Sequence, residues 1–291
     1  MRLDIVKLEN FVFRLSLCSA FTIFEYDEWL LYKKREEMRI SIVQHDIKAG
    51  DVEATLAGIE RLLLSAPEAD VYVLSEMFST GFEMDASKAA EPVGGRAQQW
   101  LKDMAARKQA AIVGSVAVSD GGKCYNRLFF VTPEGDVRYY DKRHLFTYSG
   151  ENNNYTAGDS RVVVEWRGVR FLLQVCYDLR FPVWSRNTGD YDVAIYVASW
   201  PVSRIAVWDL LLKARALENQ CYVVGVNRVG HDAVCEYSGN SVVADFYGRL
   251  VAECRKGEED VAVCELNLEK LAEFRRKFPV LLDGDRFEII R

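Results

Sequence analysis

The chain has 291 residues, of which 49% are hydrophobic and 27% are charged, and its formal net charge is −6. A chain of this length can bury a large core as one α/β domain. The negative charge, without any dense stripe of lysine and arginine, excludes the electrostatic footprint of a nucleic-acid-binding protein.

Cysteine and histidine usage indicates a reducing compartment. The chain has 7 cysteines and 3 histidines, and no two cysteines form a Cys-x-x-Cys pair. This pattern fits neither a disulfide framework nor a zinc site. We therefore expect a cytoplasmic protein that has no metal site.

Residues 1–37 differ from the rest of the chain. The apolar run 11–24 is short for a membrane span, contains Arg14 and leads into acidic residues instead of a small-residue cleavage site. Met38 then begins Met-Arg-Ile-Ser-Ile-Val-Gln, which is typical of a first strand. We expect residues 38–291 to be a single domain and residues 1–37 to be an N-terminal extension, with a mis-assigned start codon as one explanation.

From Met38 onward, apolar runs alternate with segments of 3.6-residue periodicity, which is the pattern of a layered α/β fold. Turn-forming residues at 121–122 and 133–136 predict hairpins in the middle of the chain. Helices are predicted at 51–65, 95–108, 182–188 and 203–219. Strands are predicted at 39–44, 71–75, 111–117, 127–131, 162–165, 169–175, 193–198, 222–226, 241–244 and 261–265.

The predicted helix 203–219 is apolar on more than one face. Its apolar residues include Val207, Trp208, Leu210, Leu212 and Leu217. Such a helix is either wholly internal or lies partly at a subunit interface. We therefore expect a homodimer.

Three predicted strand ends carry groups suited to thiol chemistry. Cys176 follows the run 169–175, Glu76 closes the run 71–75, and Lys142 follows a stretch that contains Val137 and Tyr139. Open α/β sheets present ligand-binding groups at the carboxyl ends of their strands. A thiol here is a candidate nucleophile, the carboxylate a candidate base, and the ammonium a group that would lower the thiol pKa and stabilise an oxyanion.

Each of these residues also has a simpler interpretation when it is taken alone. A free cysteine usually behaves as a small hydrophobic side chain. A glutamate or a lysine at a strand end is usually solvated. The combination of the three is therefore more informative than any one of them.

The three motifs together resemble the Glu-Lys-Cys triad motifs of the nitrilase superfamily, the carbon–nitrogen hydrolases. Glu76 lies in Leu-Ser-Glu-Met-Phe-Ser-Thr-Gly-Phe, Lys142 in Tyr-Asp-Lys-Arg-His-Leu-Phe, and Cys176 in Val-Cys-Tyr-Asp-Leu-Arg-Phe-Pro. The resemblance runs from about Met38 to the C-terminus and includes Ser199-Trp200-Pro201, 214–220 and 225–230.

This resemblance implies a four-layer αββα sandwich, dimerisation through a helical layer, and no metal or organic cofactor. It implies that Glu76 takes the Cys176 proton, that the thiolate attacks an amide carbonyl, and that Lys142 and the N–H of Tyr177 hold the oxyanion. Ammonia leaves, and a water activated by Glu76 hydrolyses the thioester. A second glutamate of the family corresponds to Glu151 in the loop between the Lys and Cys motifs.

The cysteine motif most resembles the omega-amidase branch, which removes the side-chain amide of 2-oxo acids such as 2-oxoglutaramate and 2-oxosuccinamate. We expect Arg180 to bind the distal carboxylate, because a guanidinium can hold it bidentately. A structural pairing of Arg180 with Asp178 or with another buried acid is the alternative. Four aromatic residues that follow strand ends are expected to wall a small pocket: Phe82, Phe146, Tyr177 and Trp200.

Three other functions remain open. One is an amidase or N-carbamoyl hydrolase of the same superfamily that acts on another small carboxylic acid. Another is a binding protein that keeps the fold without turnover. For all of these functions we expect neither nucleic acid nor membrane as a partner. The third is a Cys–His enzyme that uses His144 or His231 as its base, although a structural role for His144 explains its position beside Lys142 better.

Overall fold

The computed structural model describes residues 7–8, 11–12, 37–83 and 85–290. The chain divides into two units, Met1–Glu37 and Met38–Arg291. In the first unit, β1 (Lys7–Leu8) pairs antiparallel with β2 (Phe11–Val12). The predicted extension 1–37 otherwise lies outside the described residues, so its origin stays a prediction.

A seven-stranded sheet forms one half of the second unit. The strand order is β17 (Asp260–Asn267), β3 (Glu37–Gln44), β4 (Val71–Val73), β6 (Ala111–Asp120), β7 (Lys123–Val131) and β8 (Val137–Asp141), with β5 (Glu91–Pro92) pairing to β6. Strands β3, β4 and β6 are parallel, and β6, β7 and β8 form antiparallel hairpins. The hairpins predicted in the middle of the chain are confirmed.

A six-stranded sheet forms the other half. Its order is β16 (Leu250–Glu253), β15 (Val242–Ala244), β12 (Tyr222–Asn227), β11 (Val193–Ala198), β10 (Val169–Val175) and β9 (Val163–Trp166). The central strands β10, β11 and β12 are parallel to one another. Both faces of such strands are buried, which explains why they read as continuous apolar runs in the sequence.

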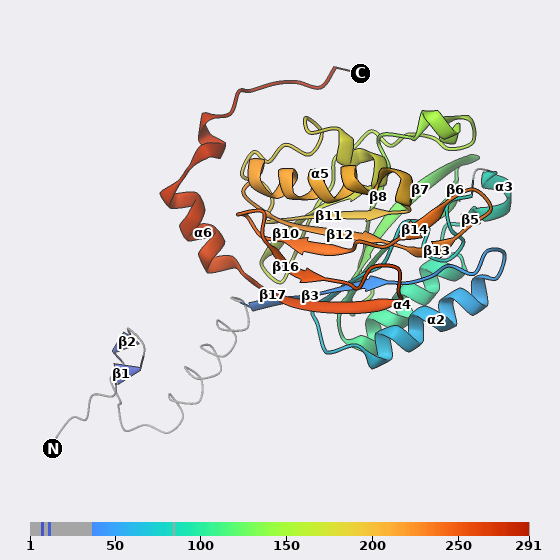
Figure 1. The fold of residues 1–291 in the computed structure, drawn as a ribbon, viewed down its shortest axis with the longest axis horizontal. Coiled ribbons are helices and arrows are strands. Elements are labelled where there is room, and N and C mark those ends of the chain that lie inside the picture. Colours follow the sequence, from blue (N-terminus) through green and yellow to red (C-terminus); the bar gives the residue numbers. More distant parts are fainter. Residues whose placement is uncertain (1–6, 9–10, 13–36, 84, 291) are drawn as a thin grey trace. The chain divides into compact units, whose positions relative to one another are not determined.

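The two sheets pack face to face and helices cover their outer faces, so the αββα sandwich is confirmed (Figure 1). Alternate residues of one strand point into different layers. Val71 and Val73 face the core between the sheets, whereas Tyr72 packs under α2 (Val52–Ser65) and α4 (Arg96–Lys108). The third apolar layer lies under α5 (Ile205–Glu218).

Helix α5 packs closely on the six-stranded sheet. Trp208 and Leu212 are fully buried, and a Cβ atom on Gly225 of β12 would lie 2.5 Å from a methyl carbon of Leu212. Glycine at this position therefore allows the close approach of helix and strand. On the outer side, Leu210 is 68% and Leu217 is 51% exposed. The helix is thus apolar on both sides, as its sequence predicts.

The largest errors in the predicted elements lie after the cysteine and at the end of the chain. No helix forms at 182–188; instead, the 3-10 helix η3 (Cys176–Arg180) precedes a turn in which Asn187 Oδ1 accepts from the N–H groups of Gly189 and Asp190. Several short elements were not predicted, among them α3 (Ala86–Ala89), β5 and β16. The hairpin β13 (Val229–His231) with β14 (Glu236–Ser238) and the helix α6 (Leu268–Lys277) were not predicted either.

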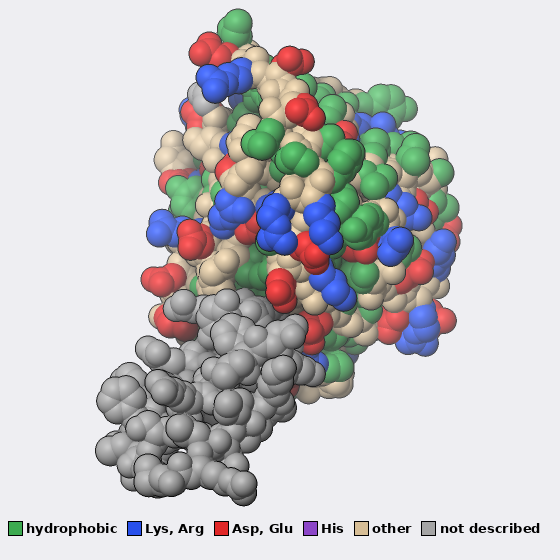
Figure 2. Space-filling model, turned by 90° about the vertical axis from the view of Figure 1, so that its left-hand side faces the viewer, with side chains coloured by type: hydrophobic (Ala, Val, Ile, Leu, Met, Phe, Trp, Pro, Cys, Tyr) green, Lys and Arg blue, Asp and Glu red, His purple; other side chains and the backbone are tan. Residues whose placement is uncertain are grey.

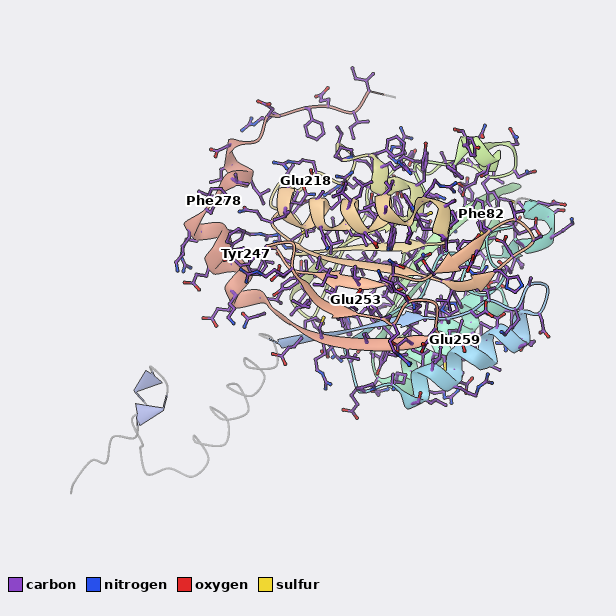
Figure 3. All side chains as sticks on the ribbon, viewed as in Figure 1. Phe82, Glu218, Tyr247, Glu253, Glu259 and Phe278 are labelled. Atoms are coloured by element: carbon purple, nitrogen blue, oxygen red, sulfur yellow. The ribbon has the colours of Figure 1, made fainter. Side chains whose placement is uncertain are left out.

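Helix α6 lies at one end of the domain and is held there by aromatic and ionic contacts. Phe274 packs against Phe246 and Tyr247 with ring centroids 5.1 and 4.6 Å apart, and Arg275 donates to Asp192 Oδ1 at 2.8 Å. Figure 3 shows Tyr247 and Phe278 beside this helix, at the end of the domain opposite Phe82. Figure 2 shows hydrophobic side chains mixed with charged ones on this face.

Within the described ranges, no helix has the length and apolar character that a membrane crossing requires.

Candidate active site

The carboxyl ends of strands from both sheets meet at one cavity. Lys142 follows β8 directly, Cys176 follows β10 directly and Ser199 follows β11, while Glu76 comes shortly after β4. All four residues line a cavity of about 390 Å³. The predicted grouping of Glu76, Lys142 and Cys176 is therefore present in space.

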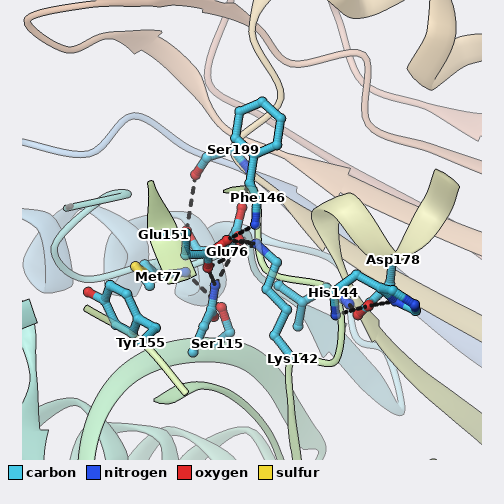
Figure 4. A network of polar contacts seen from close by, with 12 residues as sticks. Glu76, Met77, Ser115, Lys142, His144, Phe146, Glu151, Tyr155, Asp178 and Ser199 are labelled. Atoms are coloured by element: carbon cyan, nitrogen blue, oxygen red, sulfur yellow. Dashed lines mark hydrogen bonds and ion pairs between the residues drawn. The ribbon is translucent and has the colours of Figure 1, made fainter. Parts of the chain in front are cut away.

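Glu76 is 1% exposed and both of its carboxylate oxygens are hydrogen-bonded. Oε1 accepts from Lys142 Nζ and from Asn126 Nδ2, each at 2.8 Å, and Oε2 accepts from the backbone N–H of Ser199 at 2.9 Å (Figure 4). The Ser199 contact links the end of β11 to the loop after β4. A carboxylate so held has a fixed orientation toward the cavity.

Lys142 is 1% exposed and lies between two carboxylates. Its Nζ donates to Glu76 Oε1 at 2.8 Å and to Glu151 Oε1 and Oε2 at 3.1 and 2.9 Å. Burial disfavours the ammonium, but Glu151 and Glu76 outweigh this effect and hold the pKa of Lys142 well above its usual range. The lysine is therefore a fixed positive charge.

Glu151 is fully buried in the short 3-10 helix η2 (Glu151–Asn153). Its Oε2 accepts from the backbone N–H of Phe146 at 2.6 Å, and its Oε1 accepts from Asn126 Nδ2 at 3.3 Å. Burial raises the pKa of the Glu151 carboxyl, while Lys142 opposes that shift. Glu151 lies behind the cavity, where it contacts Lys142.

Cys176 has a left-handed backbone conformation, with φ at +47°, and starts η3. Single non-glycine residues in this region are strained and often occur at functional sites. Burial, followed by the Glu76 carboxylate, raises the pKa of the Cys176 thiol well above its usual range. Lys142 lowers that pKa, as expected, but the net direction is opposite to the sequence-based prediction.

Asp178 joins the cysteine loop to the lysine loop. Its Oδ2 accepts from the N–H of Val175 and from the hydroxyl of Tyr140, both at 2.9 Å. Its Oδ1 lies 3.0 Å from the backbone N of His144 and 2.8 Å from Nδ1 of that ring. The His144 ring also stacks on Phe181 with centroids 3.8 Å apart. These contacts fit the structural role predicted for His144, while His231 is exposed on β13.

Aromatic side chains form much of the cavity wall, as predicted. Phe82, Phe146, Tyr177 and Trp200 all line it, and the rings of Phe146 and Tyr177 are 5.0 Å apart. The Phe82 ring lies over the Lys142 ammonium at 5.4 Å. The wall beside the polar network is therefore largely apolar.

Arg180 also lines the cavity, and its guanidinium lies 5.1 Å from the centroid of the Trp200 ring. Asp178 uses its oxygens for Val175, Tyr140 and His144 instead. The alternative of a structural Arg180–Asp178 pair is therefore not what the structure contains.

Sequence reasoning missed several residues at this site. Ser199 and Arg228 line the cavity directly after β11 and β12, so the rule that identified Cys176 could have found them. Asn126 is a buried polar residue within the apolar strand β7. Arg204 precedes α5 and gives no comparable signal.

In the described part of the chain, no three His, Cys, Asp or Glu side chains are grouped so that they could hold a metal.

Comparison with known families identifies the fold and the chemistry. The family model described as carbon-nitrogen hydrolase matches residues 39–276. The chain belongs to this family. It is therefore a hydrolase of carbon–nitrogen bonds, and the predicted membership of the nitrilase superfamily is confirmed.

The chain is similar to two named amidases over almost the whole length of those proteins. A Yersinia enterocolitica protein named omega-amidase YafV is 46% identical over 254 residues, which are 87% of this chain and 99% of that protein. The 2-oxoglutaramate amidase of Bacillus subtilis (strain 168) is 36% identical over 250 residues, or 84% of this chain and 96% of the relative.

Solved structures agree with the fold. XC1258 from Xanthomonas campestris, a CN-hydrolase superfamily protein solved with an arsenic adduct in its active site, superposes with a TM-score of 0.84 at 42% identity. That match covers 87% of this chain and 99% of XC1258. Saccharomyces cerevisiae Nit3 gives 0.75 at 25% identity, covering 84% of this chain and 95% of Nit3.

Proposed function

We propose that this protein is an omega-amidase, which hydrolyses the side-chain amide of 2-oxo acids such as 2-oxoglutaramate and 2-oxosuccinamate to the dicarboxylate and ammonia. The observation that carries this proposal is a buried Glu76–Lys142–Glu151 network beside Cys176, in a chain 46% identical to an omega-amidase over nearly all of that relative. The small aromatic cavity suits a short substrate.

The first half of the reaction forms a thioester. Because the thiol pKa is raised by burial and by Glu76, Cys176 is protonated at neutral pH and needs a base at the moment of attack. Glu76 takes the proton as Sγ bonds to the amide carbonyl carbon. Lys142 and the N–H of Tyr177 hold the resulting oxyanion. The C–N bond then breaks, and Glu76 returns the proton to the leaving ammonia.

The second half releases the acid. Glu76 takes a proton from a water molecule, whose oxygen bonds to the thioester carbon while the same groups hold the oxyanion. The C–S bond breaks and the proton returns to Cys176 Sγ. Glu151 acts through Lys142: it holds the ammonium between two carboxylates and contacts Lys142 instead of the cavity.

The substrate-binding residues are part of the same proposal. Arg180 lies half-buried in the cavity wall over Trp200 and binds the distal carboxylate of the substrate. Phe82, Phe146, Tyr177 and Trp200 restrict substrate length and keep bulk water from the thioester.

The subunit organisation and the compartment follow from features outside the cavity. The exposed Leu210 and Leu217 on the outer side of α5 favour a homodimer formed through that helical layer. Sedimentation of wild type and Leu210→Glu tests it: a dimer that the charge converts to monomers supports the proposal, and a monomeric wild type contradicts it. Cysteine usage favours a cytoplasmic protein, which fractionation of cells would check.

Ammonia release from 2-oxoglutaramate tests the activity, with wild type and Cys176→Ala compared. Succinamate, glutamine, an N-carbamoyl amino acid and a simple nitrile serve as alternative substrates. Turnover of the 2-oxo acid amide by wild type alone is the expected result. Cys176-dependent turnover of another substrate would replace the omega-amidase assignment by another amidase or a carbamoylase, and a lack of all turnover would favour a binding protein.

A further inference from the structure

A second arginine, Arg204, lies in the wall of the same cavity as Arg180. It ends the 3-10 helix η4 (Val202–Arg204) and immediately precedes α5. Its carbonyl oxygen accepts a hydrogen bond from Trp200 Nε1 at 2.9 Å, and its guanidinium lies 5.2 Å from the centroid of the Phe146 ring. Two aromatic wall residues therefore fix the backbone and the side chain of Arg204.

Arg180 and Arg204 are placed in the same way. Each guanidinium lies over an aromatic ring of the cavity wall, Arg180 over Trp200 and Arg204 over Phe146. Stacking of this kind orients the planar group while it leaves the N–H donors on its edge available. Both side chains are half-buried, so solvent does not fully screen their charges.

The other cations of the cavity are neutralised by nearby carboxylates. Lys142 is held by Glu76 and Glu151, and Arg228 Nη2 lies 3.3 Å from Asp46. Among the described residues, no carboxylate lies within 4 Å of the guanidinium of Arg180 or Arg204. Within the part of the chain that the structure describes, these two charges therefore have aromatic contacts but no carboxylate partner.

Besides Glu76, the acidic residues that line the cavity are Asp232 and Glu83, and both accept hydrogen bonds from neighbouring residues. Asp232 accepts from the Tyr237 hydroxyl and from two backbone N–H groups of its own loop. Glu83 accepts from the N–H of Asp85.

Arg204 also lies at the N-terminal end of α5. It is the residue before the first turn of a 14-residue helix whose first turn contains no acidic residue. The N-terminal end of a helix carries positive partial charge, which repels a cation and attracts an anion. A carboxylate bound beside Arg204 would relieve this repulsion.

We propose that Arg204 forms, with Arg180, a two-guanidinium clamp for the carboxylate next to the 2-oxo group, and that this clamp excludes amino acids. The inference rests on the proposed function. A 2-oxo acid amide is an anion at its distal end, whereas glutamine carries an α-ammonium beside the same carboxylate. Two unneutralised guanidinium groups attract the first and repel the ammonium of the second. The clamp thus selects the 2-oxo acid over the amino acid of the same length.

The test compares four amides with five-carbon chains: 2-oxoglutaramate, glutaramate, L-glutamine and pentanamide. Arg204→Met keeps the length of the side chain and removes its charge. We expect kcat/KM for both anions to fall by about 10- to 100-fold, mainly through KM, because charge-assisted hydrogen bonds are lost. Activity on uncharged pentanamide should stay at the wild-type level, and the preference for 2-oxoglutaramate over glutamine should narrow.

Two further variants distinguish carboxylate binding by Arg204 from a purely structural role of this residue. Like Arg204, Arg249 lies over an aromatic ring, with its guanidinium 4.9 Å from the centroid of Tyr247, but it does not line this cavity. Arg249→Met should therefore change none of the four rates. Arg204→Lys keeps the charge and should recover part of the anion preference. An equal loss on pentanamide, or unchanged rates on the anions, would overturn the role of Arg204.

A binding measurement tests the arginine clamp separately from the omega-amidase activity. In a Cys176→Ala background, calorimetry should show that 2-oxoglutarate binds about 10- to 100-fold more weakly when Arg204→Met is added. Failure of wild type to cleave 2-oxoglutaramate, with cleavage of glutaramate intact, would end the omega-amidase assignment but leave Arg180 and Arg204 as a clamp for a carboxylate without a neighbouring 2-oxo group. Equal affinity of the two proteins for 2-oxoglutarate would end the clamp alone.

Discussion

Two groups of charged residues at the cavity are built in opposite ways. In the Glu76 group, the ionised side chains are 1% exposed or less and each carboxylate oxygen has a donor from Lys142, Asn126 or a backbone N–H. In the arginine group, Arg180 and Arg204 are half-buried and lie over aromatic rings, with no carboxylate partner among the described residues.

Under the proposed function, this difference separates the chemistry from the recognition of substrate. A buried charge must be paired within the protein, because no ligand is present during folding to neutralise it. A half-buried guanidinium can remain hydrated until the substrate arrives. Substitutions in the Glu76 group should therefore change stability and kcat, whereas those in the arginine group should change KM and substrate preference.

Lys142→Met should have the largest effect, because it leaves Glu76 and Glu151 buried without their counter-charge. We expect the free energy of unfolding to fall by about 3–5 kcal/mol at pH 8, with loss of turnover. Urea denaturation measures this, with the exposed Lys123→Met as the control. Acidification should narrow the difference in unfolding free energy between wild type and Lys142→Met. Burial already raises the pKa of Glu151, and a neutral carboxyl needs no counter-charge. A deficit that grows on acidification would contradict this account.

Glu151→Gln should lower kcat by about 10²- to 10³-fold, because Lys142 loses one of the carboxylates that hold its charge in place. Despite burial, Glu151 and Glu76 raise the folded-state pKa of Lys142 above its unfolded value. The stabilisation from Lys142 is therefore complete below its unfolded-state pKa and is lost as the pH rises through its folded-state pKa. The variant has a lower folded pKa, so alkaline unfolding should begin at lower pH. Identical alkaline profiles would disprove the coupling.

Asp178→Asn should have an intermediate effect. An amide cannot accept from the N–H groups of Val175 and His144 and the Tyr140 hydroxyl together, so at least one buried donor is left unpaired. We expect a stability loss of about 1–3 kcal/mol. Because Asp178 positions the Cys176 and Lys142 loops, kcat should fall while KM holds. A normal kcat in the Asp178→Asn enzyme would exclude the positioning role.

Ser199→Ala should have the smallest effect. The hydroxyl makes one long hydrogen bond of 3.3 Å to the Glu76 carbonyl oxygen, whereas the contact to the Glu76 carboxylate comes from the Ser199 backbone and is retained. Stability should change by less than about 1 kcal/mol, with kcat close to wild type. A large loss of kcat would mean that the hydroxyl itself contacts the reacting groups.

The fold was predictable where burial is expressed in continuous apolar runs. The predicted strands 169–175 and 193–198 have the observed bounds, because central parallel strands are buried on both faces. Helix α6 was missed because most of its residues are charged or polar. Its apolar contacts come from Phe246 and Tyr247, which are distant in sequence.

The site was predictable only in part for a similar reason. Glu76, Lys142 and Cys176 follow strands, so each carries a local signal. Glu151 lies in a loop and was assigned only through the family resemblance. Nothing near Arg204 in sequence shows that its guanidinium lies on Phe146, because that contact exists only after the strands are assembled.

The left-handed backbone at Cys176 is unfavourable for any residue that has a Cβ atom. With φ at +47°, this position would suit glycine better, by about 1 kcal/mol. Cys176→Gly should therefore resist denaturant better than Cys176→Ala, although neither has a thiol.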